Sequence, residues 1–449
     1  MRLTVFVHDT PVATLDSPDG FGHVLSYYPT AKPEQFTSLL MPVRTQSYDY
    51  PELHPLFRMN LPEGFLLSVL QERLGPHVGS SPLNLLSVVG RNAIGRVKVA
   101  PEGADPKSPP VAFEVRHILR GDNSEQAFMG LVREFAVSGV SGVVPKFLAP
   151  AAAAAAAAAG QDANKLPGKT TLATEKFIVK GTPASLPGVA LNEHFCMQVA
   201  QRAFGNAAKT EVSDDAQALV VHRFDYEEDG RTRLGMEDLC SLLSLRPEQK
   251  YDATWERVAK RIKDVTPVGC QATALSDLGN LLLLTYALRN ADCHTKNIAL
   301  LYSSRQDVRL APVYDMLSIT VYDDYCNNPP GMSIQGLQTW NPGKALTLFL
   351  QHYCGIGLAG VHAKVERVCE AIVEVSPEVL RATRDNKHFT EVGVRMLRAW
   401  NEGMNSLRLQ KGWSLPNLDH LYGDDALAKV ADAKAPRKVL GRSPLKLMS

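Results

Sequence analysis

The sequence predicts an α+β fold with two lobes, a mixed lobe of strands and helices followed by a helical lobe. The chain has 449 residues, too many for one compact core and suited to two or three domains of roughly 150 residues each. Its composition, 45% hydrophobic and 21% charged, is that of a globular protein. Strand-like alternation occurs up to about residue 245, and long helical patterns dominate beyond it.

Residues 1–100 are expected to form a small N-terminal α/β subdomain. Residues 1–7 alternate as a strand, and the apolar residues of 66–74 recur at helical spacing. The stretch 101–110, rich in proline, glycine and charge, indicates a surface joint. The mixed lobe is then predicted over residues 111–245.

Within the mixed lobe, residues 177–180 and 217–226 have the composition of strands, and residues 191–204 have the spacing of an amphipathic helix. Nine consecutive alanines at 151–159 precede them. Alanine favours a helix, but the flanking proline and glycine suit a mobile insert equally well, so both interpretations stay open.

The helical lobe is predicted over residues 246–425. Its most hydrophobic helix, around 278–288, is interrupted by Asn280, and this favours a buried core helix over a membrane span. Residues 426–449 form a basic tail, for which a solvated terminus is the preferred interpretation.

The bulk charge and the cysteines exclude several classes of protein. A net charge of +1 argues against electrostatic binding of nucleic acid or of a membrane by the whole molecule. The first residues lack the long apolar stretch of a secretory signal, so a cytoplasmic protein is expected. The seven cysteines form no C-x-x-C pair, and free thiols are therefore predicted.

The sharpest candidate site is Asn-Ala-Asp-Cys-His-Thr-Lys-Asn at 290–297, followed by Ala-Pro-Val-Tyr-Asp at 311–315. In phosphoryl transfer one carboxylate orients the attacking hydroxyl, while an asparagine and a second carboxylate hold magnesium against the ATP phosphates. Asp292, Asn297 and Asp315 supply these groups in the order that protein kinases use. An apolar strand predicted at 308–313 precedes Asp315, so this carboxylate can face the other two groups. The D-x-x-x-x-N string alone is common, since a capped helix C-terminus gives similar residues.

Kinase chemistry also requires a lysine on a strand and a loop over the phosphates. Lys180 ends the strand 177–180 on a face that can point into a cleft, although a lysine at a strand end is more often solvated. Glu193, on the inward side of the next helix, is the predicted ion partner of Lys180. The loop 139–146 holds two glycines whose backbone N–H groups can approach phosphate, and a plain hairpin turn explains it equally well.

Seven motifs follow one another along the chain: Gly-Arg-Asn-Ala-Ile-Gly-Arg-Val at 90–97, Val-Ser-Gly-Val-x-Pro-Lys at 140–146, Asn192-Glu193, Arg223-Phe224-Asp225, Glu237-Asp238-Leu239-Cys240, Asp292-x-His294-x-Lys296-Asn297 and Tyr314-Asp315. Together they resemble the HipA family over nearly the whole chain. The resemblance implies a two-lobed protein-kinase-like (HipA-like) fold with an all-α C-terminal lobe. It also implies a Ser/Thr protein kinase that uses ATP and Mg²⁺.

Carried over to this sequence, the resemblance implies that Asp292 is the catalytic base and that Asn297 and Asp315 bind magnesium. Lys180 would contact the phosphates, and His222 to Phe224 would form the adenine-side hinge. The implied ATP-binding residues are Ser141, Gly142, Val143, Val144, Pro145, Lys146, Lys180, His222, Arg223, Phe224, His294, Lys296, Asn297, Tyr314 and Asp315.

The sequence departs from the family pattern before the phosphate loop. Family members commonly carry an autophosphorylated serine at the position that Gly139 occupies here. Autophosphorylation is therefore either lost or moved to Ser138 or Ser141. The alanine run also lengthens the segment between the loop and Lys180, which costs little in stability.

The family resemblance also implies partners. These are a helix-turn-helix antitoxin of the HipB type, operator DNA bound through that antitoxin, and a protein substrate such as an aminoacyl-tRNA synthetase, whose phosphorylation slows growth. Two alternatives stay open: a small-molecule kinase of the aminoglycoside or choline type, and a non-catalytic corepressor that acts with the antitoxin. The motif at 90–97 argues against the first alternative, and the full set of catalytic groups argues against the second.

Overall fold

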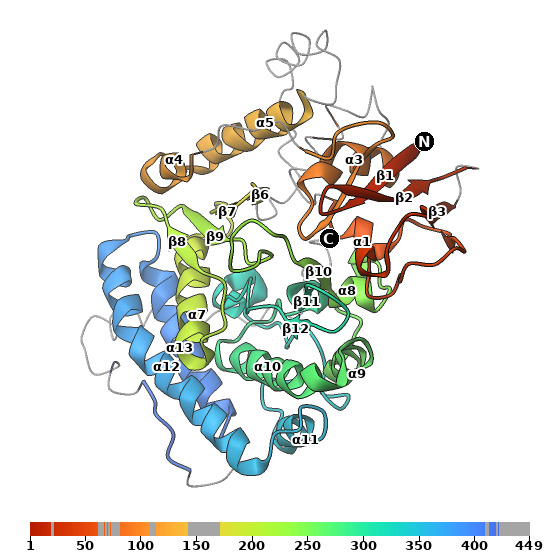
Figure 1. Ribbon diagram of the computed structural model, residues 1–449. Helices are drawn as coiled ribbons and strands as arrows, with labels where there is room; N and C mark the ends of the chain where they lie inside the picture. The colour runs from red at the N-terminus through yellow and green to blue at the C-terminus, as the bar shows by residue number, and fades with distance from the viewer. Residues whose placement is uncertain are drawn as a thin grey trace.

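The computed structural model describes residues 1–18, 22–61, 81–107, 114–141, 171–408 and 413–418, together with residues 67, 70, 72 and 421. Three antiparallel sheets and a large group of packed helices make up these parts of the chain. Figure 1 shows the N-terminal sheet and the sheet formed by residues 171–222 in the upper part of the view, with the long helices of the second lobe below them. The two-lobed α+β fold predicted from the sequence is confirmed.

The N-terminal part is a five-stranded sheet in the order β4-β3-β2-β1-β5. Its strands are β1 (Arg2–Val7), β2 (Thr10–Asp16), β3 (His23–Tyr27), β4 (Tyr48–Tyr50) and β5 (Val97–Pro101). His8 and Asp9 have φ values of 50° and 63°, which gives the two-residue turn between β1 and β2 the left-handed backbone that suits a twisted hairpin. The short helices α1 (Pro55–Arg58) and α3 (Pro82–Val89) share the apolar core of this sheet.

The mixed lobe is built on a four-stranded sheet in the order β6-β7-β9-β8. Its strands are β6 (Thr171–Ala173), β7 (Phe177–Gly181), β8 (Thr210–Val212) and β9 (Ala218–His222). Helices α4 (Val115–Arg120) and α5 (Glu125–Ser141) share a core with one face, and α7 (Val189–Phe204) packs on the other. Because side chains alternate along a strand, Val179 joins the α5 side and Lys180 lies on the α7 side. The predicted strand and helix around Lys180 are confirmed.

Long helices form most of the second lobe. They are α9 (Trp255–Val265), α10 (Val268–Ala287), α11 (Lys344–His352), α12 (Leu358–Asp385) and α13 (Thr390–Ser406), preceded by the single turn α8 (Leu239–Leu242). Trp255 and Trp400 are completely buried among them. Helix α7 packs along α12, so the apolar core continues from one lobe into the other. In the described parts of the chain, no helix has both the length and the apolar character needed to cross a membrane.

A small third sheet, β10 (Gly235–Asp238), β11 (Ala299–Tyr302) and β12 (Val308–Leu310), lies where the lobes meet. Because β11 and β12 come after residue 245, the lobe expected to be entirely helical contains a short hairpin. The strand predicted at 308–313 corresponds to β12, whereas β11, with four residues, gives too little alternation to be recognised in the sequence. Short 3-10 helices occur at Pro33–Gln35, Gly90–Asn92, Pro247–Gln249, Thr295–Asn297, Ile319–Val321 and Asp323–Tyr325.

Some sequence predictions concern parts of the chain outside the described residues. These are most of the helix predicted at 66–74, the alanine run at 151–159 and the basic tail at 426–449. By contrast, all seven cysteines are described and free, as predicted.

Candidate active site

A buried ionic cluster joins the two lobes. Lys180 Nζ lies 2.6 Å from Glu193 Oε1 on α7 and 2.6 Å from Asp315 Oδ1, which follows β12. The side chain of Glu193 is 3% exposed and that of Lys180 15% exposed. A carboxylate at this depth needs a cation to offset its lost hydration. The structure therefore brings together three residues that the sequence assigned to one site, whereas their roles toward a nucleotide stay predictions.

The neighbouring residue of Glu193 fixes α7 to the segment that carries Asp315. Asn192 Oδ1 accepts a hydrogen bond of 2.8 Å from the backbone N–H of Ser318, and Asn192 Nδ2 donates one of 3.1 Å to the Ser318 carbonyl. Asn192 and Ser318 are both completely buried. Because this amide pairs with both backbone groups of one residue, it sets how far Glu193 stands from Asp315.

Asp315 has an unusual backbone conformation. Its φ of 53° lies in the left-handed region, which costs a non-glycine residue about 1 kcal/mol or more and is common at functional sites. The preceding residue, Tyr314, is held by a hydrogen bond of 2.8 Å from its hydroxyl to the Lys296 carbonyl. Val313 pairs with the backbone on both sides of Ala207, so the segment is also fixed to the mixed lobe.

Asp292 lies in the loop between α10 and β11. The Asn290 side chain accepts the backbone N–H of Asp292 at 3.0 Å, and Asn297 Nδ2 donates to the Asp292 carbonyl at 3.0 Å. Gly331 packs against the same loop, where a Cβ would stand only 2.4 Å from the Cys293 carbonyl oxygen. These contacts close the loop on itself, so Asp292 and Asn297 are brought together as predicted from their spacing.

Tyr251 is a member of the site that the sequence did not reveal. Its hydroxyl donates a hydrogen bond to Asp292 Oδ1. Its ring stands edge to face with the His294 ring, with centroids 4.9 Å apart. Burial, followed by the charge of Asp292, raises the pKa of Tyr251 well above its usual value, so the phenol keeps its proton. No spacing rule links position 251 to the loop 290–297, because their contact depends on tertiary packing.

His294 is buried beside Asp292, with 3.8 Å between His294 Nε2 and Asp292 Oδ1. Burial lowers the pKa of His294 to about 4, so the ring is neutral at physiological pH. The charges of Asp292 and Asp315 both act on His294 and on Tyr251. Both carboxylates are therefore close enough to these two rings to act on them electrostatically.

The oxygen atoms of Asn297 and Asp315 suit magnesium, which prefers oxygen ligands and keeps part of its coordination shell open to water and phosphate. These residues offer one amide oxygen and one carboxylate. The bond from Asn297 Nδ2 to the Asp292 carbonyl fixes the amide, so Oδ1 is the atom that it could offer to a metal ion. Among the described residues, no group of three or more His, Cys, Asp or Glu side chains is arranged to hold a metal. Phosphate oxygens and water would have to complete the coordination.

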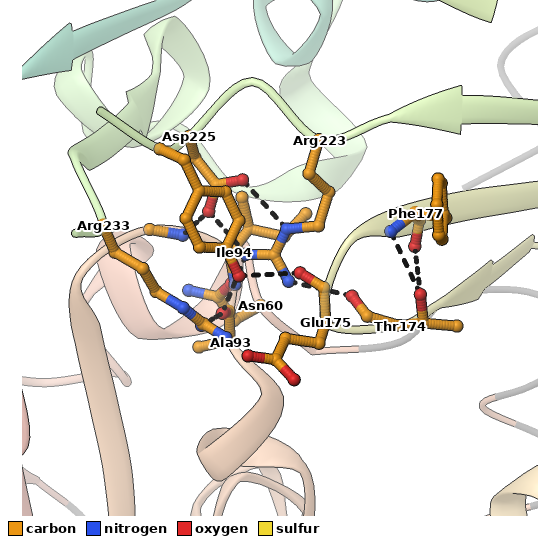
Figure 2. A network of polar contacts seen from close by, with 11 residues as sticks. Asn60, Ala93, Ile94, Thr174, Glu175, Phe177, Arg223, Asp225 and Arg233 are labelled. Atoms are coloured by element: carbon orange, nitrogen blue, oxygen red, sulfur yellow. Dashed lines mark hydrogen bonds and ion pairs between the residues drawn. The ribbon is translucent and has the colours of Figure 1, made fainter. Parts of the chain in front are cut away.

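The side chains of the three predicted hinge residues, His222 to Phe224, have different contacts. His222 Nε2 lies 2.5 Å from Glu211 Oε1, and the ring of Phe224 packs on Tyr314 with centroids 5.4 Å apart. The side chain of Arg223 is only 2% exposed, and Figure 2 shows that it is paired with Asp225. The Arg223 side chain thus pairs with other groups of the protein, so only the backbone of Arg223 could contact a nucleotide.

The predicted phosphate loop is only partly covered by the structure. Ser138, Gly139 and Ser141 belong to the last turns of α5, so the expectation that the loop begins at residue 139 is corrected to a helix that continues through Ser141. Gly139 lies inside this helix, so that glycine did not end it. Residues 142–146, from Gly142 to Lys146, lie outside the described residues.

The strand lysine paired with a helix glutamate, together with the Asp/Asn loop between a helix and a hairpin, defines a protein-kinase-like class of fold. Comparison with known families then identifies the chain. Residues 3–100 match the family described as HipA N-terminal domain, and residues 138–380 match the HipA-like C-terminal domain. The chain belongs to the HipA family.

Two relatives come from Sinorhizobium fredii. One, named "Putative kinase Y4mE", is 26% identical over 380 residues, which cover 78% of this chain and 84% of the relative. The other, "Putative kinase Y4dM", is 27% identical over 289 residues, or 60% of this chain and 63% of the relative. A solved structure of the Shewanella oneidensis MR-1 toxin–antitoxin system, HipA with HipB and operator DNA, matches with a TM-score of 0.58 and 16% identity over 95% of this chain and 94% of that one. This last likeness supports the fold.

Proposed function

We propose that the protein is an ATP- and magnesium-dependent Ser/Thr protein kinase, which transfers the γ-phosphate of ATP to a hydroxyl group of another protein. The observation that carries the proposal is the position of Lys180, within 2.6 Å of both Glu193 and Asp315. A lysine held between a helix carboxylate and the metal-side carboxylate is the arrangement that clamps ATP phosphates in protein kinases. The kinase names of the two relatives agree with it.

In this proposal Asp292 accepts the proton of the acceptor hydroxyl. The hydroxyl oxygen forms a bond to the γ-phosphorus while the bond to the β,γ-bridging oxygen breaks, and ADP leaves. Because Tyr251 donates to Asp292 Oδ1, we assign the other oxygen of the carboxylate to accept the proton. His294 stays neutral and adds no positive charge that would compete for the carboxylate.

The remaining residues hold the nucleotide. Lys180 binds phosphate oxygens, and Glu193 holds the lysine in place. Asn297 and Asp315 would hold the magnesium ion, which would supply positive charge to offset that of the phosphates. Residues 141–146 cover the phosphates, while His222 to Phe224, together with His294, Lys296 and Tyr314, line the nucleotide site.

The proposal extends to the partners of the protein. The Shewanella HipA was solved with HipB and operator DNA, and its fold extends over 95% of this chain. We therefore infer a helix-turn-helix antitoxin of the HipB type as a partner, with operator DNA bound through it, since the net charge of +1 gives this chain little affinity of its own for DNA. The proposed substrate is a protein of the translation apparatus such as an aminoacyl-tRNA synthetase.

Labelling with [γ-³²P]ATP in a bacterial lysate tests this function. Label in protein bands, present with the wild type and with Asp264→Asn on the exposed end of α9 but absent with Asp292→Asn, supports a protein kinase. Label that appears only in small molecules selects a kinase of the aminoglycoside or choline type. The absence of any transfer in the presence of magnesium selects a non-catalytic corepressor.

Autophosphorylation is a separate part of the proposal, at Ser138 or Ser141 near the end of α5. Intact-mass measurement after incubation with ATP tests it. A species heavier by about 80 Da, the mass of one phosphoryl group, that is absent from Asp292→Asn would support it. If no heavier species forms in the wild type, the proposal of autophosphorylation is wrong.

A further inference from the structure

A loop of the N-terminal part, residues 93–95, lies directly against the middle of the protein. The backbone N–H of Gly95 donates a hydrogen bond of 2.7 Å to Asp225 Oδ2. Gly95 has a φ of 88°, and a Cβ at this position would stand 3.1 Å from the backbone nitrogen of Met236 in β10. Only glycine allows this approach without strain. We call residues 93–95 the docking loop.

The docking loop contacts a buried ion pair between Arg223, in the predicted hinge, and Asp225, just after it. Arg223 Nε and Nη2 contact the two carboxylate oxygens of Asp225 at 2.9 and 2.5 Å, and both side chains are 2% exposed. Arg223 Nη1 also donates to the Thr174 carbonyl at 3.0 Å (Figure 2). Burial alone would raise the pKa of Asp225, but the bonds from Arg223 and Gly95 hold it below its usual value. The pair is therefore ionised and fixes the backbone on both sides of residue 224.

The residue between the two charges reaches the candidate active site. The Phe224 ring packs on Tyr314, with centroids 5.4 Å apart and an angle of 36° between the rings. The Tyr314 hydroxyl in turn donates to the Lys296 carbonyl in the loop of Asp292, and the next residue is Asp315. A continuous set of contacts thus leads from the docking loop, through Phe224, to both sides of the proposed nucleotide site.

We propose that the docking loop is a positioning element for nucleotide binding, which acts through Arg223 and Asp225 on Phe224 and Tyr314. This inference rests on the proposed function and deepens it, because it assigns the N-terminal part a role in ATP affinity. While its hydrogen bonds hold the docking loop in place, the backbone of residues 222–224 and the ring of Tyr314 are already ordered, so they lose little conformational entropy when the nucleotide binds. When the loop is loosened, the nucleotide has to order them, and affinity falls.

The loop can be loosened without replacing either member of the ion pair or any residue predicted to touch the nucleotide. Asn60 Oδ1 accepts the N–H of Ile94 at 2.9 Å, and Arg233 Nη1 donates to the Ala93 carbonyl at 3.0 Å. The double variant Asn60→Ala/Arg233→Ala removes both bonds. Arg231→Ala, an exposed position in the same turn as Arg233, is the matched control.

Two measurements test whether the docking loop is coupled to the nucleotide site. The first is hydrogen exchange of the nucleotide-free protein, in which the double variant should exchange faster at residues 222–226 and also at 313–315. The second is calorimetric binding of a non-hydrolysable ATP analogue with magnesium, for which the double variant should bind about fivefold more weakly or worse, the lower end of usual coupling between sites. The Arg231→Ala control should match the wild type in both.

The opposite results are equally clear. If the double variant melts at a lower temperature but keeps wild-type exchange at 313–315 and wild-type analogue affinity, the docking loop has a structural role only and the inference is overturned. If the wild type itself binds no analogue, the proposed function fails, and the exchange of 313–315 alone then decides whether the docking loop and the segment of Tyr314 are coupled.

Discussion

Lys180 Nζ lies 2.6 Å from Asp315 Oδ1, and this contact links strand β7 of the mixed lobe to the segment that follows the hairpin of the helical lobe. The lysine also contacts Glu193 Oε1 at 2.6 Å, so one cation pairs with two carboxylates. The ionic cluster thus fixes the position of β7 relative to α7 and to the segment of Asp315.

Replacing Lys180 by methionine, which has a similar length and no charge, should damage both stability and activity. Glu193 would be left buried without its cation, which costs roughly 3 kcal/mol in the free energy of unfolding. The rate of phosphoryl transfer should fall by about 100-fold or more, as for the loss of one group that stabilises developing charge. Denaturant unfolding and label transfer measure the two effects, with Lys260→Met on the exposed face of α9 as the control. Transfer at the wild-type rate would show that Lys180 does not bind the phosphates.

Tyr251→Phe should reduce kcat by about tenfold and leave the KM for ATP nearly unchanged. Its hydroxyl bonds to Asp292, and a hydrogen bond to a charged group contributes about 1.5 kcal/mol or more. As a positioning residue for the base, Tyr251 affects the chemical step rather than nucleotide binding. Steady-state kinetics test this, with Tyr353→Phe, at a half-exposed position, as the matched control. An unchanged kcat, or a loss confined to KM, would remove Tyr251 from the mechanism.

Asp315→Asn should raise the magnesium concentration required for activity by about tenfold, because an amide oxygen is a weaker ligand for a hard cation than a carboxylate. The measurement is a magnesium titration of the transfer rate at fixed ATP. Asp264→Asn, on the surface of α9, should titrate like the wild type. A variant with the wild-type magnesium requirement would mean that Asp315 is not a metal ligand.

Acid should destabilise the protein through two buried histidines. Burial lowers the pKa of His54 from 6.5 to about 4, and that of His294 likewise to about 4. In the unfolded chain these two histidines are therefore protonated near pH 6.5, whereas in the folded protein they stay neutral until about pH 4. The stabilisation is complete above pH 6.5 and is lost progressively as the pH falls toward 4.

His54 offers a direct test of this pH dependence. Its Nδ1 accepts the N–H of Leu56 at 3.1 Å at the start of α1, a bond that requires the neutral ring. His54→Asn keeps an acceptor at the cap but cannot titrate. Its melting temperature should be lower than that of the wild type near neutral pH, but should fall less between about pH 7 and about pH 5. An equal fall in both proteins would contradict the assignment.

Local patterns were sufficient to predict much of the fold. The alternation at 177–180 and the helical spacing at 191–204 correspond to β7 and α7, and they place Lys180 opposite Glu193. Of the hairpin, the strand predicted at 308–313 corresponds to β12, but β11 was not predicted, because its four residues are too few to show a period. The domain limits drawn from the sequence stay predictions.

The candidate site was predictable where its residues are close in sequence. Asp292 and Asn297 share one loop, so their spacing brought them together. Tyr251 was missed, and the docking loop was noted only as part of the motif at 90–97, because their contacts depend on packing between segments about 40 or more residues apart. The left-handed backbone of Asp315 carries no signal in the sequence, since glycine or asparagine is the usual residue there.

The central claim is that Asp292 acts as the base at a site that binds ATP independently of it. The most direct test compares Asp292→Asn with the wild type for two quantities, the affinity for ATP with magnesium and the rate of γ-phosphate transfer to protein. The expected result is an affinity within about threefold of the wild type and a transfer rate lower by about 100-fold or more. Transfer at an undiminished rate in Asp292→Asn would contradict the account.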